Sequence, residues 1–450
     1  MQNSSETVFK VDQRVHYAAQ PQKTGVVKYV GPLDGYSGDW VGVDWDADGN
    51  GRHNGSHNGV AYFTARGHDT ASFLRPHNLS AGVSLLEALQ TRYQTASTKE
   101  EEDEMYVLSA RNNRVSVQLL GKEKIQDKMS RFGDLTSVSL SYLGVRFPGS
   151  PDHVRSVLPN LKELDLTGNL IDKWEPAAST VVQGFHSLRL LNLENNCIAS
   201  WDEIKKLSQL NSLEQLILSN NELNHIRYPD CGAYTDFKSL RGLLLASNKI
   251  EDLESIDSLN SFPSLMEVRL SGNPIADLGE GGIPRFVFIA RLSKIKIFNG
   301  SEISPRERKD SEIRYVRMVM SKCRGSPDET RKLHPRFAEL KSTHGIEDEK
   351  QSIGASGNQK MASGLISISL KCIGASMGEK PILVKKLPAT TTVGKLKNLC
   401  ESFFKLKSVR PILFLQEEGS PVPTLLNDDM ESLMELGIGN ESTILVDEEP

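Results

Sequence analysis

The chain of 450 residues has no apolar run close to the roughly 20 residues that a helix needs to cross a bilayer. Its first residues also lack the basic and apolar regions of a secretion signal. These two absences argue against the membrane-spanning and secreted classes of protein. We therefore expect a cytoplasmic protein with no membrane partner.

Cysteine is scarce and scattered. The five cysteines lie far apart and never form a Cys-x-x-Cys pair, which argues against a disulfide framework and a zinc knuckle. His53 and His57 are four residues apart, but the segment between them reads as a loop and no third ligand follows at a suitable spacing. We expect reduced thiols and no metal site.

An excess of basic charge is also missing. Lysine and arginine number 53 against 58 acidic residues, a net charge of −5, whereas nucleic-acid binders usually show a basic face. No G-x-x-x-x-G-K-[ST] loop is present to hold a nucleotide. The one G-x-S-x-G match, at residues 374–378, falls between two predicted strands, and no histidine follows it. We predict no enzyme, no cofactor and no nucleic-acid partner.

The segments that are present differ in composition, and a chain of this length predicts two to four domains. The predicted limits are a Gly- and aromatic-rich domain at 8–79, a connector at 80–134, a Leu- and Asn-rich block at 135–300, a cap helix and linker at 301–362, and a last domain at 363–450.

The middle block carries an internal repeat. The pattern L-x-x-L-x-L-x-x-N-x-L/I occurs five times at intervals of 25 or 27 residues, beginning at Leu161, Leu188, Leu213, Leu240 and Leu265, with a degenerate copy at Leu135. Each copy offers one short strand and cannot bury its apolar side alone, so the copies must stack. The pattern predicts an α/β leucine-rich repeat solenoid in which the Asn side chains turn inward and bind backbone groups. Residues 292–300 and a helix through Ile313 and Val316 should cover its end.

The strand face of this solenoid is the predicted contact surface. Alternation along the strands places one central column on that face, formed by Asp165, Asn192, Ile217, Leu244 and Arg269. Ile217 and Leu244 would form an apolar patch suited to a macromolecule. The alternative is that they are two of the scattered aliphatic side chains that any surface exposes.

The N-terminal block resembles a CAP-Gly domain, a small β-rich fold, over about 70 residues, through the segments 38–45, 51–63 and 73–76. The resemblance implies a groove for acidic C-terminal tails that end in an aromatic residue, as on α-tubulin. Trp40 and Phe63 would line this groove with Phe73 at its edge. The loop Gly51-Arg52-His53-Asn54-Gly55 would present Arg52, His53 and Asn54 to the carboxylates of the tail.

This loop departs from the common family form Gly-Lys-Asn-Asp-Gly, since it loses an acid and gains a second group that can carry positive charge. We expect the preference for acidic tails to be retained. The alternative is that the glycines serve only to form turns.

The C-terminal block resembles a ubiquitin-like domain, an α+β fold of the β-grasp type. Two strands at 365–370 and 382–387, a helix at 393–404, and strands at 412–415 and 443–446 follow in that order. The tail at 447–450 has no Gly-Gly, so we expect a built-in docking module and not a conjugated modifier.

The order of these three domains is similar to that of the tubulin-folding cofactor E family. The resemblance implies a non-enzymatic chaperone that binds α-tubulin by its tail and its folded body. It also implies that cofactors C and D act with it, together with β-tubulin, to assemble or dissociate the αβ heterodimer, and it admits cofactor B and the proteasome as further partners.

Two other functions remain open from the sequence. The CAP-Gly resemblance alone suggests a microtubule plus-end adaptor, which would place the protein on the cytoskeleton. The ubiquitin-like end alone suggests an adaptor that links tubulin to degradation. No sustained heptad run supports the coiled coil through which plus-end adaptors commonly dimerise.

Overall fold

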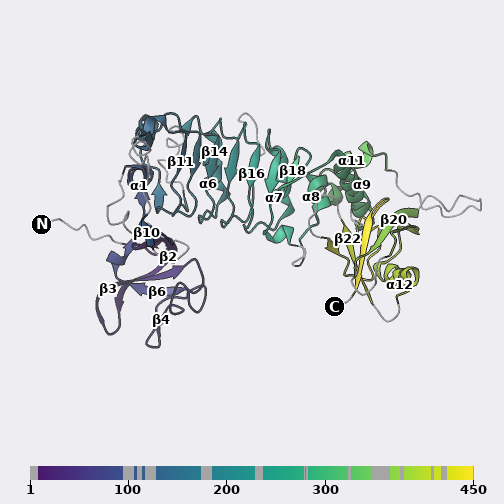
Figure 1. The fold of residues 1–450 in the computed structure, drawn as a ribbon, viewed down its shortest axis with the longest axis horizontal. Helices are drawn as coiled ribbons and strands as arrows, with labels where there is room; N and C mark the ends of the chain where they lie inside the picture. Colours follow the sequence, from purple (N-terminus) through teal and green to yellow (C-terminus); the bar gives the residue numbers. More distant parts are fainter. Residues whose placement is uncertain are drawn as a thin grey trace, which may run out of the picture. The chain divides into compact units, whose positions relative to one another are not determined.

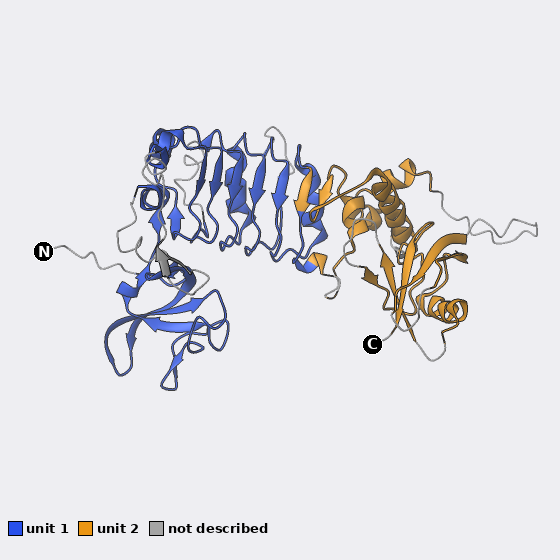
Figure 2. Ribbon diagram, in the orientation of Figure 1, with its two compact units in different colours: residues 1–265, 269–274 blue, residues 266–268, 275–450 orange. Residues whose placement is uncertain are grey.

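The computed structural model describes residues 9–94, 106–108, 114–116, 128–173, 185–228, 237–277, 279, 282–322, 326–346, 365–374, 380–406, 410–416 and 423–448. It divides into two compact units (Figure 2). Unit 1 comprises Met1–Leu265 and Arg269–Pro274, and unit 2 comprises Met266–Val268 and Ile275–Pro450. Within the described residues, no helix has both the length and the apolarity that crossing a membrane requires.

Unit 1 begins with a small antiparallel β-domain (Figure 1). Its five-stranded sheet has the order β6-β3-β2-β1-β7, built from β1 (Arg14–Tyr17), β2 (Gln20–Leu33), β3 (Tyr36–Trp45), β6 (Ala71–Leu74) and β7 (Leu79–Ser80). A short hairpin of β4 (Ser56–His57) and β5 (Val60–Ala61) and the turn η1 (Pro76–Asn78) complete it. Val15, Val27, Val43 and Trp45 are fully buried, so alternate residues of the strands form the core.

The segment after this sheet, which composition predicts to be a connector, starts with structure of its own. Strand β8 (Val83–Ser84) pairs in parallel with β12 (Val145–Phe147) at the start of the repeats. Helix α1 (Leu85–Tyr93) follows, with a capping box between Ser84 and Glu87 that satisfies its first backbone N–H groups. A two-stranded pair of β9 (Tyr106–Leu108) and β10 (Arg114–Ser116) lies further along the chain.

The repeats form a parallel ladder, as the pattern predicts. In unit 1 the strand order is β11 (Ser137–Ser139), β13 (Glu163–Asp165), β14 (Leu190–Asn192), β15 (Gln215–Ile217) and β16 (Gly242–Leu244). Short helices and turns connect the strands: η2 (Phe132–Asp134), α4 (Pro151–Val157), α6 (Trp201–Lys205), η4 (Lys206–Gln209), α7 (Leu253–Ser258) and η5 (Leu259–Ser261). The repeat leucines are buried between the strands and these helical segments.

The repeat asparagines form a buried ladder of hydrogen bonds, which we call the asparagine ladder: Asn169, Asn196, Asn221, Asn248 and Asn273. Asn196 shows the pattern. Its Oδ1 accepts the N–H of Ile171 at 3.2 Å, and its Nδ2 donates to the carbonyls of Leu166 and Leu193 at 3.1 and 3.0 Å. The prediction that these side chains turn inward and bind backbone groups is confirmed.

Strand β17 (Glu267–Arg269) enters unit 2 with its first two residues, which pair in parallel with β18 (Ile297–Phe298). Strand β18 pairs antiparallel with β19 (Ser301–Glu302). The turn η6 (Pro274–Ala276) and the helices α8 (Arg285–Arg291), α9 (Pro305–Lys322), α10 (Pro327–Leu333) and α11 (Phe337–Thr343) form the cap. Phe286, Tyr315, Val316 and Leu340 belong to its buried cluster. The predicted helix through Ile313 and Val316 is therefore present, and Val316 is buried in this cluster.

The last domain of unit 2 has a mixed five-stranded sheet of order β21-β20-β24-β22-β23 with one helix. Its elements are β20 (Leu365–Cys372), β21 (Leu383–Pro388), α12 (Val393–Phe404), β22 (Pro411–Gln416), β23 (Thr424–Leu425) and β24 (Thr443–Glu448). The central pair β20 and β24 is parallel. Val393, Leu396, Cys400 and Phe404 on one helix face are buried in the core. This arrangement is the predicted ubiquitin-like β-grasp fold.

Candidate functional site

The loop from Gly51 to Gly55 in the β-domain is fixed by backbone contacts. The N–H of Arg52 donates to the carbonyl of Ala71 at 2.7 Å, and the N–H of Ala71 donates to the carbonyl of His53 at 2.9 Å. Gly55 has a φ of +98°, and a Cβ there would lie 2.2 Å from the carbonyl oxygen of Phe63. A Cβ at Gly51 would lie 2.3 Å from the backbone of Ala71. Both glycines therefore permit the loop to approach its neighbours closely.

Beside the loop lies an aromatic cluster centred on Phe73, which the sequence placed at the edge of the groove. The ring of His53 stacks on Phe73 with centroids 4.8 Å apart. Tyr62 and Phe63 contact Phe73 edge-on at centroid distances of 5.4 and 5.6 Å. Tyr29 contacts it at 6.2 Å. These half-buried rings form an apolar surface on which another aromatic ring could stack.

Trp40 belongs to a second aromatic group that joins the first. The guanidinium of Arg75 lies over the indole of Trp40 at 4.0 Å, and Tyr36 contacts Trp40 at a centroid distance of 5.6 Å. Tyr36 also contacts His57 at 5.5 Å, and His57 contacts Phe73 at 6.3 Å. The predicted residues Trp40, Phe63 and Phe73 are therefore linked through ring contacts, and we call this set of side chains, together with the loop, the groove.

The charged groups of the groove differ from one another in ionisation. Arg52 is exposed and supplies the positive charge of the loop. Nδ1 of His53 accepts the N–H of Gly55 at 3.0 Å, so the ring proton lies on Nε2. Burial, together with His57, lowers the pKa of His53 below its usual value, so this imidazole is uncharged at pH 7. Asn54 is exposed, and its Oδ1 accepts a hydrogen bond from Ser56 at 2.7 Å.

Several groove residues were missed from the sequence: Tyr29, Tyr36, His57, Tyr62 and Arg75. Arg75 could have been found, because it lies two residues after Phe73 and alternation along that chain segment places the two on one face. Tyr36 and Tyr29 come from the β2–β3 hairpin, and no sequence signal links that turn to the loop.

Unpaired polar atoms concentrate in this domain. Among the described residues, five buried side-chain polar atoms have no hydrogen-bond partner: Arg14 Nε, Trp40 Nε1, Asp44 Oδ1, His57 Nε2 and Arg285 Nη2. All but the last belong to the β-domain, and two of them belong to rings that touch Tyr36.

The strand face of the repeats carries the predicted column in register, since Asp165, Asn192, Ile217 and Leu244 pair strand by strand. Burial disfavours the charge of Asp165, but hydrogen bonds from Ser141, Thr167 and Ser139 outweigh it and hold the pKa of this carboxyl below its usual value. Asp165 is therefore ionised and already satisfied by its neighbours.

The apolar part of this column is smaller than predicted. Leu244 is only 9% exposed, whereas Ile217 is half-buried and Arg269 is exposed. Leu244 is therefore mainly a core residue, and Ile217 is the main aliphatic contact that the central column offers. Gly242, which points to the same face of this strand, is buried as well.

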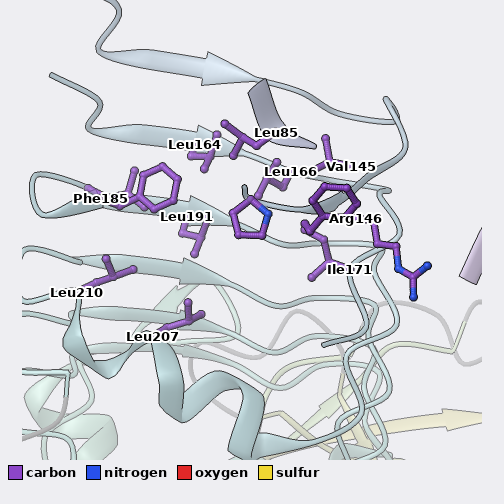
Figure 3. Close-up of a pocket in the computed structure, with 13 residues that line it drawn as sticks. Leu85, Val145, Arg146, Leu164, Leu166, Ile171, Phe185, Leu191, Leu207 and Leu210 are labelled. Carbon is purple, nitrogen blue, oxygen red and sulfur yellow. The ribbon is translucent and has the colours of Figure 1, made fainter. Parts of the chain in front are cut away.

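A cavity within the repeats is too small to be a ligand site. It has a volume of about 20 Å³ and is lined almost entirely by apolar side chains, among them Leu164, Leu166, Ile171 and Leu191 (Figure 3). Such an apolar space of about one water volume stays empty. In the described parts of the chain, no group of three or more His, Cys, Asp or Glu side chains is arranged to hold a metal ion.

Comparison with known proteins agrees with this architecture. Residues 11–79 match the family model described as the CAP-Gly domain. A tubulin-folding cofactor E from Arabidopsis thaliana is 51% identical, with 99% of each chain covered. A tubulin-specific chaperone E from Danio rerio is 28% identical over 86% of this chain and 89% of the relative.

A solved structure, the C-terminal ubiquitin-like domain of mouse tubulin-specific chaperone e, is 26% identical and covers 22% of this chain and 96% of its own, with a TM-score of 0.17. The similarity to the Arabidopsis relative extends over nearly the whole length of both proteins. The chain described here belongs to the tubulin-folding cofactor E family.

Proposed function

We propose that this protein is a cytoplasmic tubulin chaperone that binds α-tubulin at two places. The groove of the β-domain would take the acidic C-terminal tail, and the strand face of the repeats would take the folded body. The observation that carries this proposal is the groove itself, in which the exposed Arg52 lies on a fixed loop beside the aromatic cluster of Phe73. Full-length similarity to a tubulin-folding cofactor E supports it.

The groove would recognise two features of a tail, its terminal aromatic residue and its carboxylates. An aromatic residue at the chain end would stack among Tyr62, Phe63 and Phe73. The carboxylates would meet Arg52, Asn54 and the Nε2–H of His53. Because His53 is uncharged at neutral pH, it would act as a hydrogen-bond donor while Arg52 supplies the charge.

The strand face would bind the folded body of α-tubulin through non-covalent contacts and would not catalyse a reaction. Its central column offers Asn192, Ile217 and Arg269 to a partner, whereas Asp165 is engaged by its own neighbours. Once one surface has bound α-tubulin, the effective concentration for binding at the other surface is raised. Each contact can therefore be weak on its own. Cofactors C and D with β-tubulin, and cofactor B, complete the proposed set of partners in heterodimer assembly or dissociation.

The test of the groove is Arg52→Ala in the full chain. We expect its affinity for a labelled peptide ending in Glu-Glu-Tyr, measured by fluorescence anisotropy, to fall about tenfold, since one charge-assisted contact contributes roughly 1.5–3 kcal/mol. Arg92→Ala, at an exposed position on α1, is the matched control and should bind like the wild type. Unchanged affinity of Arg52→Ala would contradict the assignment.

The test of the client is size-exclusion chromatography of the protein with αβ-tubulin. We expect α-tubulin to leave the column with the protein. The CAP-Gly match alone would also suit a plus-end adaptor. That alternative predicts sedimentation with polymerised tubulin and no co-elution with soluble dimer.

A third function, a degradation adaptor, rests on the ubiquitin-like domain. If removal of residues 363–450 left tubulin binding intact but abolished association with the proteasome, that role would be supported. If the removal instead weakened tubulin binding, the domain would belong to client recognition.

A further inference from the structure

A polar cleft in unit 2 lies between the cap and the last domain, and we call it the arginine cleft. It has a volume of about 620 Å³, which is in the size range of small-molecule sites in proteins. Helix α9 forms one wall, and the chain around the start of β24 forms the other. The polar side chains that line the two walls include Arg306, Arg314, Arg317, Asn440, Ser442 and Thr443.

The two walls are joined by a close contact around Arg314. Its Nε and Nη2 donate to the carbonyl of Leu436 at 2.9 and 2.6 Å, and its guanidinium lies 3.8 Å over the ring of Phe286. Gly437 has a φ of +69°, and a Cβ there would lie 2.2 Å from Cγ of Arg314. The last domain is therefore packed directly against the cap, which gives the arginine cleft its second wall.

The charges of the arginine cleft do not balance. Four arginines and three acidic residues line it, which leaves one positive charge in excess. The acids are already paired within the protein. Oε1 of Glu307 accepts from Arg285 at 2.8 Å, and Arg306 forms ion pairs with both Asp310 and Glu441. A ligand with negative charge would therefore meet arginine and not an unpaired carboxylate.

Arg317 carries the charge that the cleft leaves uncompensated. This side chain is half-buried, and within the described residues it makes no hydrogen bond or ion pair. A Cβ at Gly439 would lie 3.0 Å from Nη1 of Arg317, so this guanidinium reaches the backbone of the last domain. The hydroxyls of Ser442 and Thr443 belong to the same wall of the cleft.

This set of groups fits phosphate better than other ligands. A guanidinium presents a planar fork of N–H groups that matches two oxygens of a phosphate, and hydroxyls can donate to a third. An apolar ligand would cover these charged and polar groups without giving them partners, which is costly. The ligand chemistry that the arginine cleft favours is therefore a compact group with several phosphate oxygens.

We propose that the arginine cleft binds a small molecule that carries phosphate groups, with Arg317 as its main contact. The hydroxyls of Ser442 and Thr443 would bind the same phosphate groups from the last domain. Because the ligand would touch both walls, its binding would also strengthen the attachment of the last domain to the cap. The inference goes beyond the proposed function, since no residue of this cleft belongs to the groove or to the central column of the repeats.

The experiment is isothermal titration calorimetry of the full chain with inorganic triphosphate, and with citrate as an anion that has no phosphate. We expect one triphosphate per chain, bound at least tenfold more tightly than citrate. Arg317→Ala should weaken triphosphate binding about tenfold, because a charge-assisted contact is lost. Arg317→Lys keeps the charge without the fork, so its loss should be about threefold. Arg331→Ala, at an exposed arginine on α10, is the matched control and should bind like the wild type.

A second pair of variants tests the need for both walls without removing a charge. Gly437→Ala would push a Cβ into the stem of Arg314, so we expect triphosphate binding to weaken at least fivefold. Gly345→Ala is its matched control, since Gly345 has a similar φ of +61° but no atom lies within 4 Å of the added Cβ. This control should bind triphosphate like the wild type.

The outcomes decide between the parts of the proposal. If the wild type does not bind triphosphate, or binds citrate equally well, the phosphate site is wrong. If triphosphate binds but Arg317→Ala binds it as tightly as Arg331→Ala, the ligand lies elsewhere and the assignment to this cleft is overturned. If Gly437→Ala binds like Gly345→Ala, the cap alone forms the site and the link to the last domain is overturned.

Competition then identifies the molecule that carries the phosphates. Displacement of triphosphate by adenosine triphosphate would indicate a nucleotide, and displacement by inositol hexakisphosphate would indicate an inositol phosphate. Displacement by neither would contradict the proposal, because the cleft would then not accept phosphates attached to an organic group. None of these results depends on peptide binding to the groove, so the failure of one proposal leaves the other intact.

Discussion

The asparagine ladder and the groove treat buried polar groups in opposite ways. In the ladder, five asparagines that are at most 5% exposed have donors and acceptors matched to backbone groups. In the groove, two ring nitrogens are just as dry but unmatched. The comparison separates a scaffold, which satisfies its own hydrogen bonds, from the proposed site, where two buried ring nitrogens have no partner.

The cause of this difference is geometric. Each repeat places its asparagine at the same point relative to the strand before it, so one solution for the hydrogen bonds serves all copies. The groove is assembled from β3, β4, β6 and the loop between them, and each side chain has a different environment. Irregular assembly of this kind can leave groups free for a ligand.

The largest expected effect comes from breaking the ladder. In Asn196→Ala, the buried N–H of Ile171 loses its acceptor. The carbonyls of Leu166 and Leu193 each lose one of two donors and keep the other, from Asn169 and Asn221. We expect a loss of about 3 kcal/mol in the free energy of unfolding of the repeats, measured by urea denaturation.

Two further measurements complete this test. Asn211→Ala, at an exposed position, should cost less than about 0.5 kcal/mol. Peptide binding to the groove should survive in Asn196→Ala under conditions where it remains folded. If Asn196→Ala left the free energy of unfolding almost unchanged, the ladder would not stabilise the repeats. The proposed difference between the ladder and the groove would then be wrong.

A smaller effect is expected from alanine substitutions at two glycines of the β-domain. They separate the need for close backbone contact from the need for a positive φ. Gly55 and Gly59 both have positive φ, of +98° and +80°, but only Gly55 would place a Cβ against the chain, 2.2 Å from the carbonyl oxygen of Phe63. Gly59→Ala should cost only the strain of a side chain at positive φ, about 1–2 kcal/mol. Gly55→Ala should cost more and weaken peptide binding at least tenfold. Thermal unfolding and anisotropy on the same samples would decide, and equal behaviour of the two variants would remove the argument for close approach.

The smallest expected effect is a difference in pH sensitivity. The pKa of His53 lies below its usual 6.5, so below pH 6.5 the unfolded chain takes up a proton that the folded groove resists, and stability falls as the pH falls. The pKa of Asp165 lies below its usual 3.8, so its contribution is intact above that pH and is lost only as the pH falls further. Mild acid should therefore weaken the groove before the repeats.

The measurement is the thermal midpoint of unfolding between pH 7 and pH 5. Replacing His53 by phenylalanine should flatten the fall by about 1–2 °C, because the ring still stacks but no longer titrates. His77→Phe should follow the wild type. If magnetic resonance titration put the His53 pKa at or above 6.5, the assigned sign would be wrong.

The fold was largely readable from the sequence, for physical reasons that differ between domains. The repeats were predictable because each copy must bury the same leucines and satisfy the same asparagine. The ubiquitin-like domain was predictable because the helix of residues 393–404 buries one face, with Val393, Leu396 and Cys400 at helical spacing. In both cases the residues that recur at regular spacing in the sequence lie on one buried face of the structure.

The sites were less predictable, because their residues contact one another in the fold but are not regularly spaced in the sequence. Leu244 belonged to the predicted column, but its burial depends on what surrounds that strand. Tyr36 and Tyr29 belong to the β2–β3 hairpin, and they contact His57 and Phe73 only because the chain folds. Their positions in the sequence do not indicate these contacts. The uncharged state of His53 follows from its burial and from the neighbouring His57, which no spacing in the chain reveals.

The first and last strands of the repeats bear on how the molecule avoids self-association. An outermost strand of a parallel sheet is a template on which another chain can add. Here the hydroxyl of Tyr93 on α1 accepts the backbone N–H of Ser139 on β11 at 3.1 Å. After the last repeat, β19 turns back antiparallel on β18 and stops the parallel register. At each end of the repeats an element outside the repeated pattern therefore contacts the terminal strand, which reduces the backbone edge on which another chain could add.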